Sequence, residues 1–359
     1  MTPERHKAIE AILASPQNEA AGRRWGQRFE QQLQQRLQAF ADSGQARKLY
    51  VAGQLGGIVS APASVDAGMQ PAQARAWLQA AVDARPRDAL VARFEIDGCA
   101  GMGLRCDPAG ALAFLLRQEP DNAEVQLRAV LDARRRGDRA AVERHWQDAA
   151  SATRFQGGAA LLGPALLEAY AGLDWPLPDA RFSHILEQLR GHGLDLDLRA
   201  AALMEAQQVW ASQGFEPGLL LQEMHGCRGE PAGSARWDEC ASVAALLAED
   251  SSNLLVPMVG LKTLIELTAG MPEQEPWQQR LRRIQWLQQA AATETLGELM
   301  SAAMYAWVET MLRDGELAAL RQQLARHGKA AEPPADWAPG DGPMLDAGGG
   351  VQITLPAGS

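Results

Sequence analysis

Four cysteines are the side chains whose type and spacing most clearly suggest chemistry. They form two close pairs, Cys99 with Cys106 and Cys227 with Cys240, and each pair brackets a glycine-containing loop. If each loop joins two antiparallel helices, its two sulfurs lie near enough for a disulfide, which would stabilise the fold by roughly 2–3 kcal/mol. Free buried thiols are the alternative. A third interpretation adds His225 to the second pair as a metal ligand, although the spacing matches no zinc finger or ribbon.

Acid–base catalysis would require histidines or carboxylates that share a pocket. An enzyme should therefore bring together at least two of five candidate side chains: His184, His192, Asp195, Asp197 and His225. The sequence contains no Gly-x-Ser-x-Gly nucleophile elbow, no phosphate-binding Gly-x-x-x-x-Gly-Lys-Ser/Thr loop and no His-Glu-x-x-His zinc pair. We therefore expect no catalytic residues, no cofactor-binding residues and no metal ligands.

Two further features suggest contact with a partner. Arg134, Arg135 and Arg136 form one of the densest runs of positive charge, which is suited to a phosphate or an acidic peptide. The chain has ten tryptophans beside only three tyrosines, and several tryptophans fall in apolar stripes that predict core packing. Trp337 is the exception, because it lies in a segment rich in proline and glycine. We expect Trp337 to dock into a groove, either on this protein or on a partner.

Composition predicts that helices position these residues. The 359-residue chain contains 65 Ala and 45 Leu but only 14 Val and 8 Ile. Ala and Leu are strong helix formers, whereas strands favour Val, Ile, Thr and aromatic residues. Because 47% of the residues are hydrophobic, the chain can bury a substantial core. These values predict an all-α protein and argue against a large β-sheet.

Helical periodicity recurs along the chain, and capping residues mark its boundaries. Asp107-Pro108 is typical of an N-cap followed by proline at the first helical position, and Gly328 follows the cations of a last turn. After Pro178, the spacing predicts helices at residues 180–191, 197–213, 235–249, 253–268, 276–293, 295–314 and 316–327. Because these helices are short and their connections brief, we expect a stack of antiparallel helical hairpins.

Short internal repeats occur in the first half of the chain. Pro71–Leu78 matches Pro108–Leu115 at an offset of 37 residues, with five of eight positions identical. Pro86–Ala89 and Pro120–Ala123 recur at an offset of 34 residues. A repeat of this length is the signature of an array of helical hairpins.

These residues resemble the tetratricopeptide-repeat family. The resemblance lies in the period of about 34 residues, the Gly137-Asp138 turn, the Trp146 and Ala149 pair, and the junction Glu119–Ala123. The chain departs from the family pattern at Val130, which is bulky where a small residue is usual, and no junction proline follows before Gly163. The resemblance covers only residues 66–155. It implies an α-solenoid whose concave face binds a partner peptide.

The sequence predicts four segments. Residues 1–65 hold N-terminal helices, residues 66–173 hold the tetratricopeptide-like repeats, and residues 174–328 hold further helical hairpins. Residues 329–359 contain five prolines and six glycines, which predict an extended tail. Within this tail, Val351–Leu355 alternates like a single strand that could lie along the protein or join a partner's sheet.

Charge and hydropathy limit the partners and the compartment. A net charge of −10 disfavours nucleic acid. Met1–Ser15 lacks the apolar stretch of a secretory signal, and no segment contains the ~20 apolar residues that span a bilayer. As written, the chain is expected in the cytoplasm. Bridged cysteines would instead place it in the periplasm or outside the cell.

The function that these features favour is protein–protein interaction. We expect a non-catalytic scaffold, adaptor or inhibitor-type binder that reads a peptide or a folded partner with the concave face of a right-handed α-solenoid. The alternative is an enzyme whose active site lies in the concave face of a helical toroid or bundle. The sequence predicts no particular oligomeric state.

Overall fold

The computed structural model describes residues 3–59, 71–212, 220, 223–295 and 301–339. Within these residues every regular element is a helix, and helices account for 73% of the positions. The predicted all-α class is therefore confirmed. No helix of the described part combines the length and the apolar character needed to cross a membrane. The predicted strand at Val351–Leu355 lies outside the described residues.

The first half of the chain forms eight α-helices and one short 3-10 helix, Ala100–Met102. Asp107 caps one of these helices as predicted, because its carboxylate accepts the backbone N–H of Gly110 at 2.9 Å and Pro108 follows it. The eight α-helices are α1 (Pro3–Leu13), α2 (Pro16–Asp42), α3 (Ala46–Val59), α4 (Pro71–Asp83), α5 (Ala89–Asp97), α6 (Pro108–Gln118), α7 (Ala123–Arg135) and α8 (Arg139–Ala150).

The helices of the second half lie close to the predicted ranges, with one boundary wrong. The described residues contain α9 (Gly158–Ala171), α10 (Ala180–Gly191), α11 (Leu198–Ser212), α13 (Ala235–Ala248), α14 (Leu255–Leu267), α15 (Gln274–Thr295), α16 (Ala302–Asp314) and α17 (Glu316–Arg326). The helix expected from residue 295 begins only at Ala302, because the Ser301 hydroxyl accepts the N–H of Met304 and caps it there.

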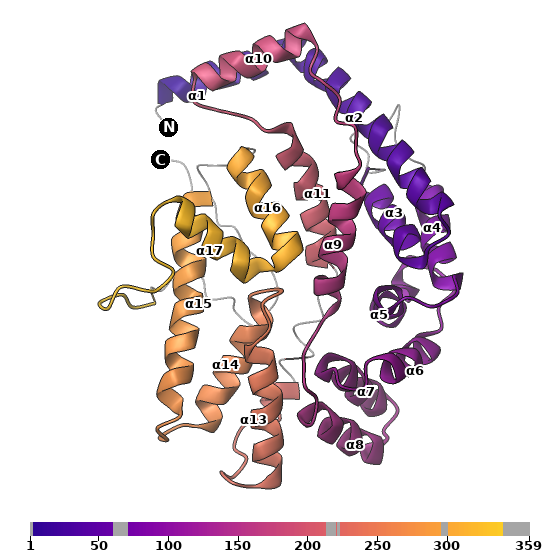
Figure 1. Ribbon diagram of the computed structural model, residues 1–359, viewed down its shortest axis with the longest axis vertical. Helices are drawn as coiled ribbons and strands as arrows, with labels where there is room; N and C mark the ends of the chain where they lie inside the picture. Colours follow the sequence, from indigo (N-terminus) through magenta and orange to yellow (C-terminus); the bar gives the residue numbers. More distant parts are fainter. Residues whose placement is uncertain (1–2, 60–70, 213–219, 221–222, 296–300, 340–359) are drawn as a thin grey trace.

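Helices that follow one another in the chain pack as pairs, and distant segments close the arrangement. The pairs α3/α4, α7/α8, α13/α14 and α16/α17 are each in contact. In Figure 1, α2 to α8 follow an arc along one side, α13 to α15 lie on the other side, and α9 and α11 run between them. The two sides meet because α8 packs on α13 and α9 packs on both α3 and α16.

Two large apolar cores support this arrangement. The first joins α2 to α5 with α9, α11 and α16, and it includes the fully buried Leu37, Tyr50 and Leu166. The second joins α7 and α8 with α13, α14, α15 and α17, and it includes the fully buried Trp146 and Leu287. Both cores combine helices that are distant in sequence. The subdivision expected at residues 65, 173 and 328 stays a prediction.

Candidate functional site

The structure places both cysteine pairs at disulfide distance. The sulfurs of Cys99 and Cys106 are 1.97 Å apart, and those of Cys227 and Cys240 are 2.09 Å apart. The first pair connects the end of α5 to the residue before Asp107, the N-cap of α6, and the second connects the loop before α13 to α13 itself. Because the sulfurs bond to one another, neither pair offers a thiolate to a metal ion, and no group of three or more His, Cys, Asp or Glu in the described part is arranged to hold one.

The carboxylates expected of an enzyme line a common groove, but arginines hold them. Asp195 and Asp197 both line it, whereas His184, His192 and His225 do not. Asp195 pairs with Arg190 at 2.9 Å and Asp197 with Arg199 at 2.7 Å. Hydrogen bonds from Arg199 lower the pKa of Asp197. A carboxylate held ionised in this way is poorly suited to donate a proton near neutral pH.

The arginine run does not form one open basic patch. Arg134 reaches the buried carboxylate of Glu223 at 2.8 Å, and Arg136 pairs with Asp132 on its own helix. Arg135 is exposed. The run therefore links α7 to the segment before α13 through Arg134. Trp337 lies against α15 of this protein, 5.5 Å from the ring of Trp286 and nearly perpendicular to it.

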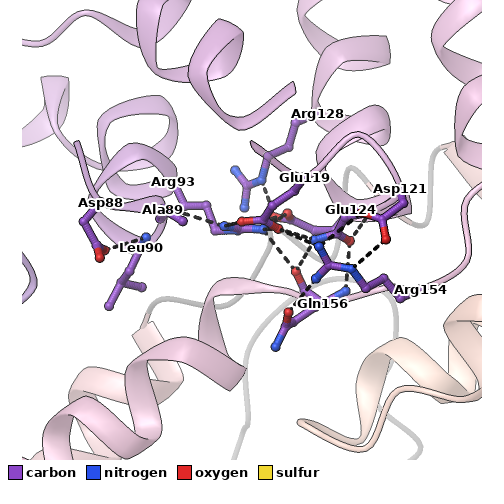
Figure 2. Close-up of polar contacts among 11 residues, drawn as sticks. Asp88, Ala89, Leu90, Arg93, Glu119, Asp121, Glu124, Arg128, Arg154 and Gln156 are labelled. Atoms are coloured by element: carbon purple, nitrogen blue, oxygen red, sulfur yellow. Dashed lines mark hydrogen bonds and ion pairs between the residues drawn. The ribbon is translucent and has the colours of Figure 1, made fainter. Parts of the chain in front are cut away.

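A network of buried charges that the sequence analysis missed lies between α5 and α7. Arg93, which is 3% exposed, holds Glu119 through two hydrogen bonds of 2.9 and 3.1 Å and Glu124 through one of 3.0 Å. Arg128 binds Glu124 from the other side and also reaches Asp97. Figure 2 shows these side chains converging from separate segments on a common centre. Buried charges are tolerated when each is paired and hydrogen-bonded, as here.

The effect of the pairing is visible in the pKa of Glu119. Burial alone would raise this pKa, but the hydrogen bonds and charge of Arg93, with help from Asn122 and Arg154, outweigh it and lower the pKa. The guanidinium of Arg93 responds in the opposite sense: burial would lower its pKa, and the charges of Glu124 and Glu119 raise it. Each partner thus stabilises the ionised form of the other.

The network also holds the segment that connects α8 to α9. The carbonyl of Gln156 accepts hydrogen bonds from Arg93 at 3.2 Å and from the Asn122 side chain at 3.0 Å. The Asn122 oxygen accepts the N–H of Gln156 at 3.0 Å, and the N–H of Ala123 donates to the carbonyl of Arg154 at 2.8 Å. Arg154 in turn binds Asp121 (Figure 2). This polar framework positions one wall of the central pocket, the cavity described next.

The central pocket has a volume of about 420 Å³ and mixes polar with apolar walls. It is lined by residues 154–156, 159–160, 210, 249–252 and 311–315. Two glycines allow the walls to approach one another. A Cβ on Gly163 would lie 1.9 Å from the carbonyl oxygen of Leu312. A Cβ on Gly315, whose φ is +92°, would lie 2.2 Å from the carbonyl oxygen of Ser251. Its buried Asp250 accepts hydrogen bonds from Ser252. The pocket is a junction between the two cores.

A second cavity, the Leu177 groove, is mainly apolar and has a volume of about 370 Å³. Its lining comes from α2, the α9–α10 connection, α10, the α10–α11 connection, the start of α11 and α16, as residues 25, 175–178, 186, 195–199 and 302. Trp25 donates to the carbonyl of Pro176 at 2.7 Å and stacks on Phe29, which stacks in turn on Trp175. Leu177 is 82% exposed between two prolines at the edge of this rigid wall.

Another set of buried polar groups occurs where α2, α9 and α11 pack together. Burial, followed by the charge of Glu30, raises the pKa of Glu205 to about 7. One carboxylate oxygen of each acid and the hydroxyl of Tyr170 are buried without a hydrogen-bond partner among the described residues. Unlike the carboxylates near Arg93, Glu30 and Glu205 form no ion pair with an arginine within the described residues. Neither of them lines the central pocket or the Leu177 groove.

Neither charged cluster followed from the sequence. Charged residues at helical spacing usually lie on solvated faces, so their spacing alone does not indicate burial. One signal was available for the network: Arg93 stands inside the apolar run Leu90–Phe94, so a helix that buries this run also buries the guanidinium. No comparable signal pointed to Glu205, because its burial depends on helices that are distant in sequence.

Comparison with known proteins adds no relative: no protein-family model, no curated protein and no solved structure matches the chain. The resemblance of residues 66–155 to tetratricopeptide repeats stays a prediction. Functional inference therefore relies on the geometry described above.

Proposed function

We propose that this protein is a non-catalytic protein-binding scaffold, and that a partner protein inserts an apolar side chain beside Leu177 in the Leu177 groove. The observation that carries the proposal is the exposure of Leu177, 82%, next to an aromatic wall. A single exposed leucine is ordinary, but one that continues into a groove lined by Trp25, Trp175 and Leu186 forms a contiguous apolar surface. Such surfaces are typical of interaction sites.

The groove is suited to binding because it is rigid before the partner arrives. Pro176 and Pro178 restrict the backbone around Leu177, and the hydrogen bond from Trp25 to Pro176 anchors this segment to α2. A preformed site loses little conformational entropy on binding. Full burial of a leucine side chain contributes about 1.5–3 kcal/mol, which is enough for Leu177 to act as an energetic hot spot.

The architecture we propose for the scaffold is a right-handed α-solenoid, tetratricopeptide-like over residues 66–173. The packing of consecutive helices against one another supports it, since stacked hairpins are the unit of such arrays. The two disulfides support an oxidising compartment, the periplasm or the cell exterior, rather than the cytoplasm. The groove also meets the condition set for the enzyme alternative, because Asp195 and Asp197 both line it. The binding role is favoured because Arg199 pairs with Asp197 and lowers its pKa, so this carboxyl is poorly suited to donate a proton near neutral pH.

The proposal is tested by comparing the proteins that co-purify with the tagged full-length wild type and with its Leu177→Asp variant. We expect at least one protein whose recovery falls about tenfold or more with Leu177→Asp, because a carboxylate would have to be desolvated in an apolar contact. Leu13→Asp is the matched control, since Leu13 is 49% exposed on α1 and does not line the groove.

Two results would contradict the proposal. Recovery of the same proteins in equal amounts with all three baits would show that Leu177 contacts no partner. A wild type that is dimeric by light scattering and becomes monomeric with Leu177→Asp would show that the groove holds a second copy of this chain instead of a different protein.

A further inference from the structure

The segment that follows the last helix lies along α15 as a bound peptide would. Residues 330–337 contain no helix, and they contact Arg282, Arg283 and Trp286, which lie one turn or less apart on α15. The indole N–H of Trp286 donates to the carbonyl of Ala330 at 3.0 Å. The contacts thus begin at the first residue of the segment and continue to its last.

Arg282 binds the segment mainly through its backbone. Its guanidinium donates to the carbonyls of Pro334 at 2.6 Å, Ala335 at 3.1 Å and Trp337 at 3.0 Å. Three carbonyls can meet one guanidinium because the chain turns there, with the N–H of Trp337 bonded to the carbonyl of Pro334. Arginine is suited to this task because its planar fork presents five N–H donors in fixed directions.

Two side chains of the segment supply specificity. Glu332 pairs with Arg283 through contacts of 2.7 and 2.8 Å. The ring of Trp337 meets the edge of Trp286 and lies 5.6 Å from the guanidinium carbon of Arg282. The residues between them include two adjacent prolines, Pro333 and Pro334, which restrict the backbone before the turn and lower the entropy lost on docking.

None of these contacts requires that the segment belong to the same chain. They consist of backbone carbonyls, one carboxylate and one indole, and all of them lie on the outer side of α15, where Arg283 and Glu332 are 46% and 63% exposed. Ion pairs this exposed exchange readily with competitors. Because the segment is attached to the protein through α17, its local concentration at the site is high. A free peptide must compete with it for the site.

We propose that Arg282, Arg283 and Trp286 form a peptide-recognition site, that residues 330–337 occupy it in cis, and that a partner binds there by displacing them. The partner presents a non-helical segment with two prolines, a turn after them, and a carboxylate five residues before a tryptophan. This site lies on α15 and is separate from the Leu177 groove. The inference goes beyond the proposed function, because it stands or fails independently of Leu177.

The test measures binding of a fluorescein-labelled synthetic peptide of residues 329–339 to full-length protein by fluorescence anisotropy. In the double variant Glu332→Ala/Trp337→Ala, the cis segment has lost both of its specific side chains. We expect this variant to bind the peptide at least tenfold more tightly than the wild type, whose site is occupied. Adding Arg282→Ala should weaken binding at least tenfold, and so should replacing the tryptophan of the peptide by alanine.

Arg280→Ala in the same background is the matched control, because Arg280 lies on α15 but contacts Glu249 and Ala248 instead of the segment. It should leave peptide binding unchanged. Thermal melting of each variant verifies that the fold is intact. The proposal is overturned if the double variant shows no saturable binding, or if binding persists equally with Arg282→Ala or with the alanine peptide.

Discussion

Two groups of buried carboxylates in this protein have opposite environments. Glu119 and Glu124 lie against Arg93, and the pKa of Glu119 is lowered although burial alone would raise it. Glu205 lies near another acid, Glu30, and burial together with that charge raises its pKa to about 7. Burial is common to both groups. The two groups differ in whether an arginine from a neighbouring helix contacts the carboxylates.

This difference predicts opposite responses to pH. A carboxylate with a lowered pKa, such as Glu119, stabilises the fold above its ordinary pKa of 4.5, and this contribution is lost as the pH falls through the lower folded value. A carboxyl with a raised pKa, such as Glu205, destabilises the fold increasingly as the pH rises from 4.5 to about 7. At neutral pH the ionised Glu119 therefore stabilises the fold, whereas ionisation of Glu205 destabilises it.

We expect the largest loss of stability from removing the positive charge of Arg93. Arg93→Met keeps much of the side-chain volume but leaves Glu119 and Glu124 without their shared partner. We expect the free energy of unfolding at pH 7 to fall by about 3–5 kcal/mol, the usual result of breaking a buried ion pair from one side. Urea denaturation followed by circular dichroism measures this change.

Arg105→Met is the matched control for Arg93→Met. Arg105 pairs with Asp83 at 3.2 Å, but the two side chains are 84% and 54% exposed. Such pairs contribute at most about 1 kcal/mol. Equal losses of stability for the two variants would contradict the view that buried ion pairs of Arg93 stabilise the fold more than an exposed pair does.

The next prediction concerns Glu205, the carboxyl whose pKa is raised. Glu205→Gln replaces the carboxyl by a neutral group of the same shape, so it removes the cost of ionisation. We expect the variant to be more stable than the wild type by up to about 3 kcal/mol at pH 8 but by no more than about 1 kcal/mol at pH 5, because the folded pKa is about 7 and the ordinary value is 4.5. Thermal unfolding between pH 5 and pH 8 measures the difference.

Glu273→Gln serves as control for the pH series, because Glu273 is exposed. It should change the stability little at either pH. A difference between Glu205→Gln and the wild type that does not vary from pH 5 to pH 8 would rule out ionisation of Glu205 as its cause.

We expect a smaller loss of stability from removing the disulfides, whose contribution is covalent rather than electrostatic. Replacing Cys227 and Cys240 by alanine opens a loop of 13 residues' separation, and replacing Cys99 and Cys106 opens one of 7. We expect losses of about 2–3 kcal/mol each, the longer loop costing slightly more. Because a disulfide does not titrate, each loss should be the same at pH 5 and pH 8. A loss that changes with pH would contradict this separation.

The local structure of this protein was largely predictable from its sequence. The helix at 180–191 was predicted to the residue, and the cap at Asp107 follows from a side chain that hydrogen-bonds its own helix. Such signals involve residues within one turn of each other. The start of α16 differs from the prediction because the range 295–314 places Ser301, a favourable N-cap, inside the helix.

The long-range structure was not predictable in the same way. Arg93 meets Glu124 across 31 positions, and Trp25 meets Pro176 across 151. Nothing near either residue in the chain indicates its partner. The docking of Trp337 was expected, but its position on α15 depends on contacts with Arg282 and Trp286, which are distant from it in the sequence. Contacts between distant segments thus determine both the charged interior and the candidate binding surfaces.

The most direct test of the proposed scaffold function is photocrosslinking from the groove itself. A benzophenone amino acid placed at position 177 of the full-length protein, in the organism that makes it, should join the protein to one defined partner. The same group at position 13, which is also exposed, should not do so. Identical crosslinked products from both positions, or none from position 177, would contradict the claim that the Leu177 groove is a protein-binding site.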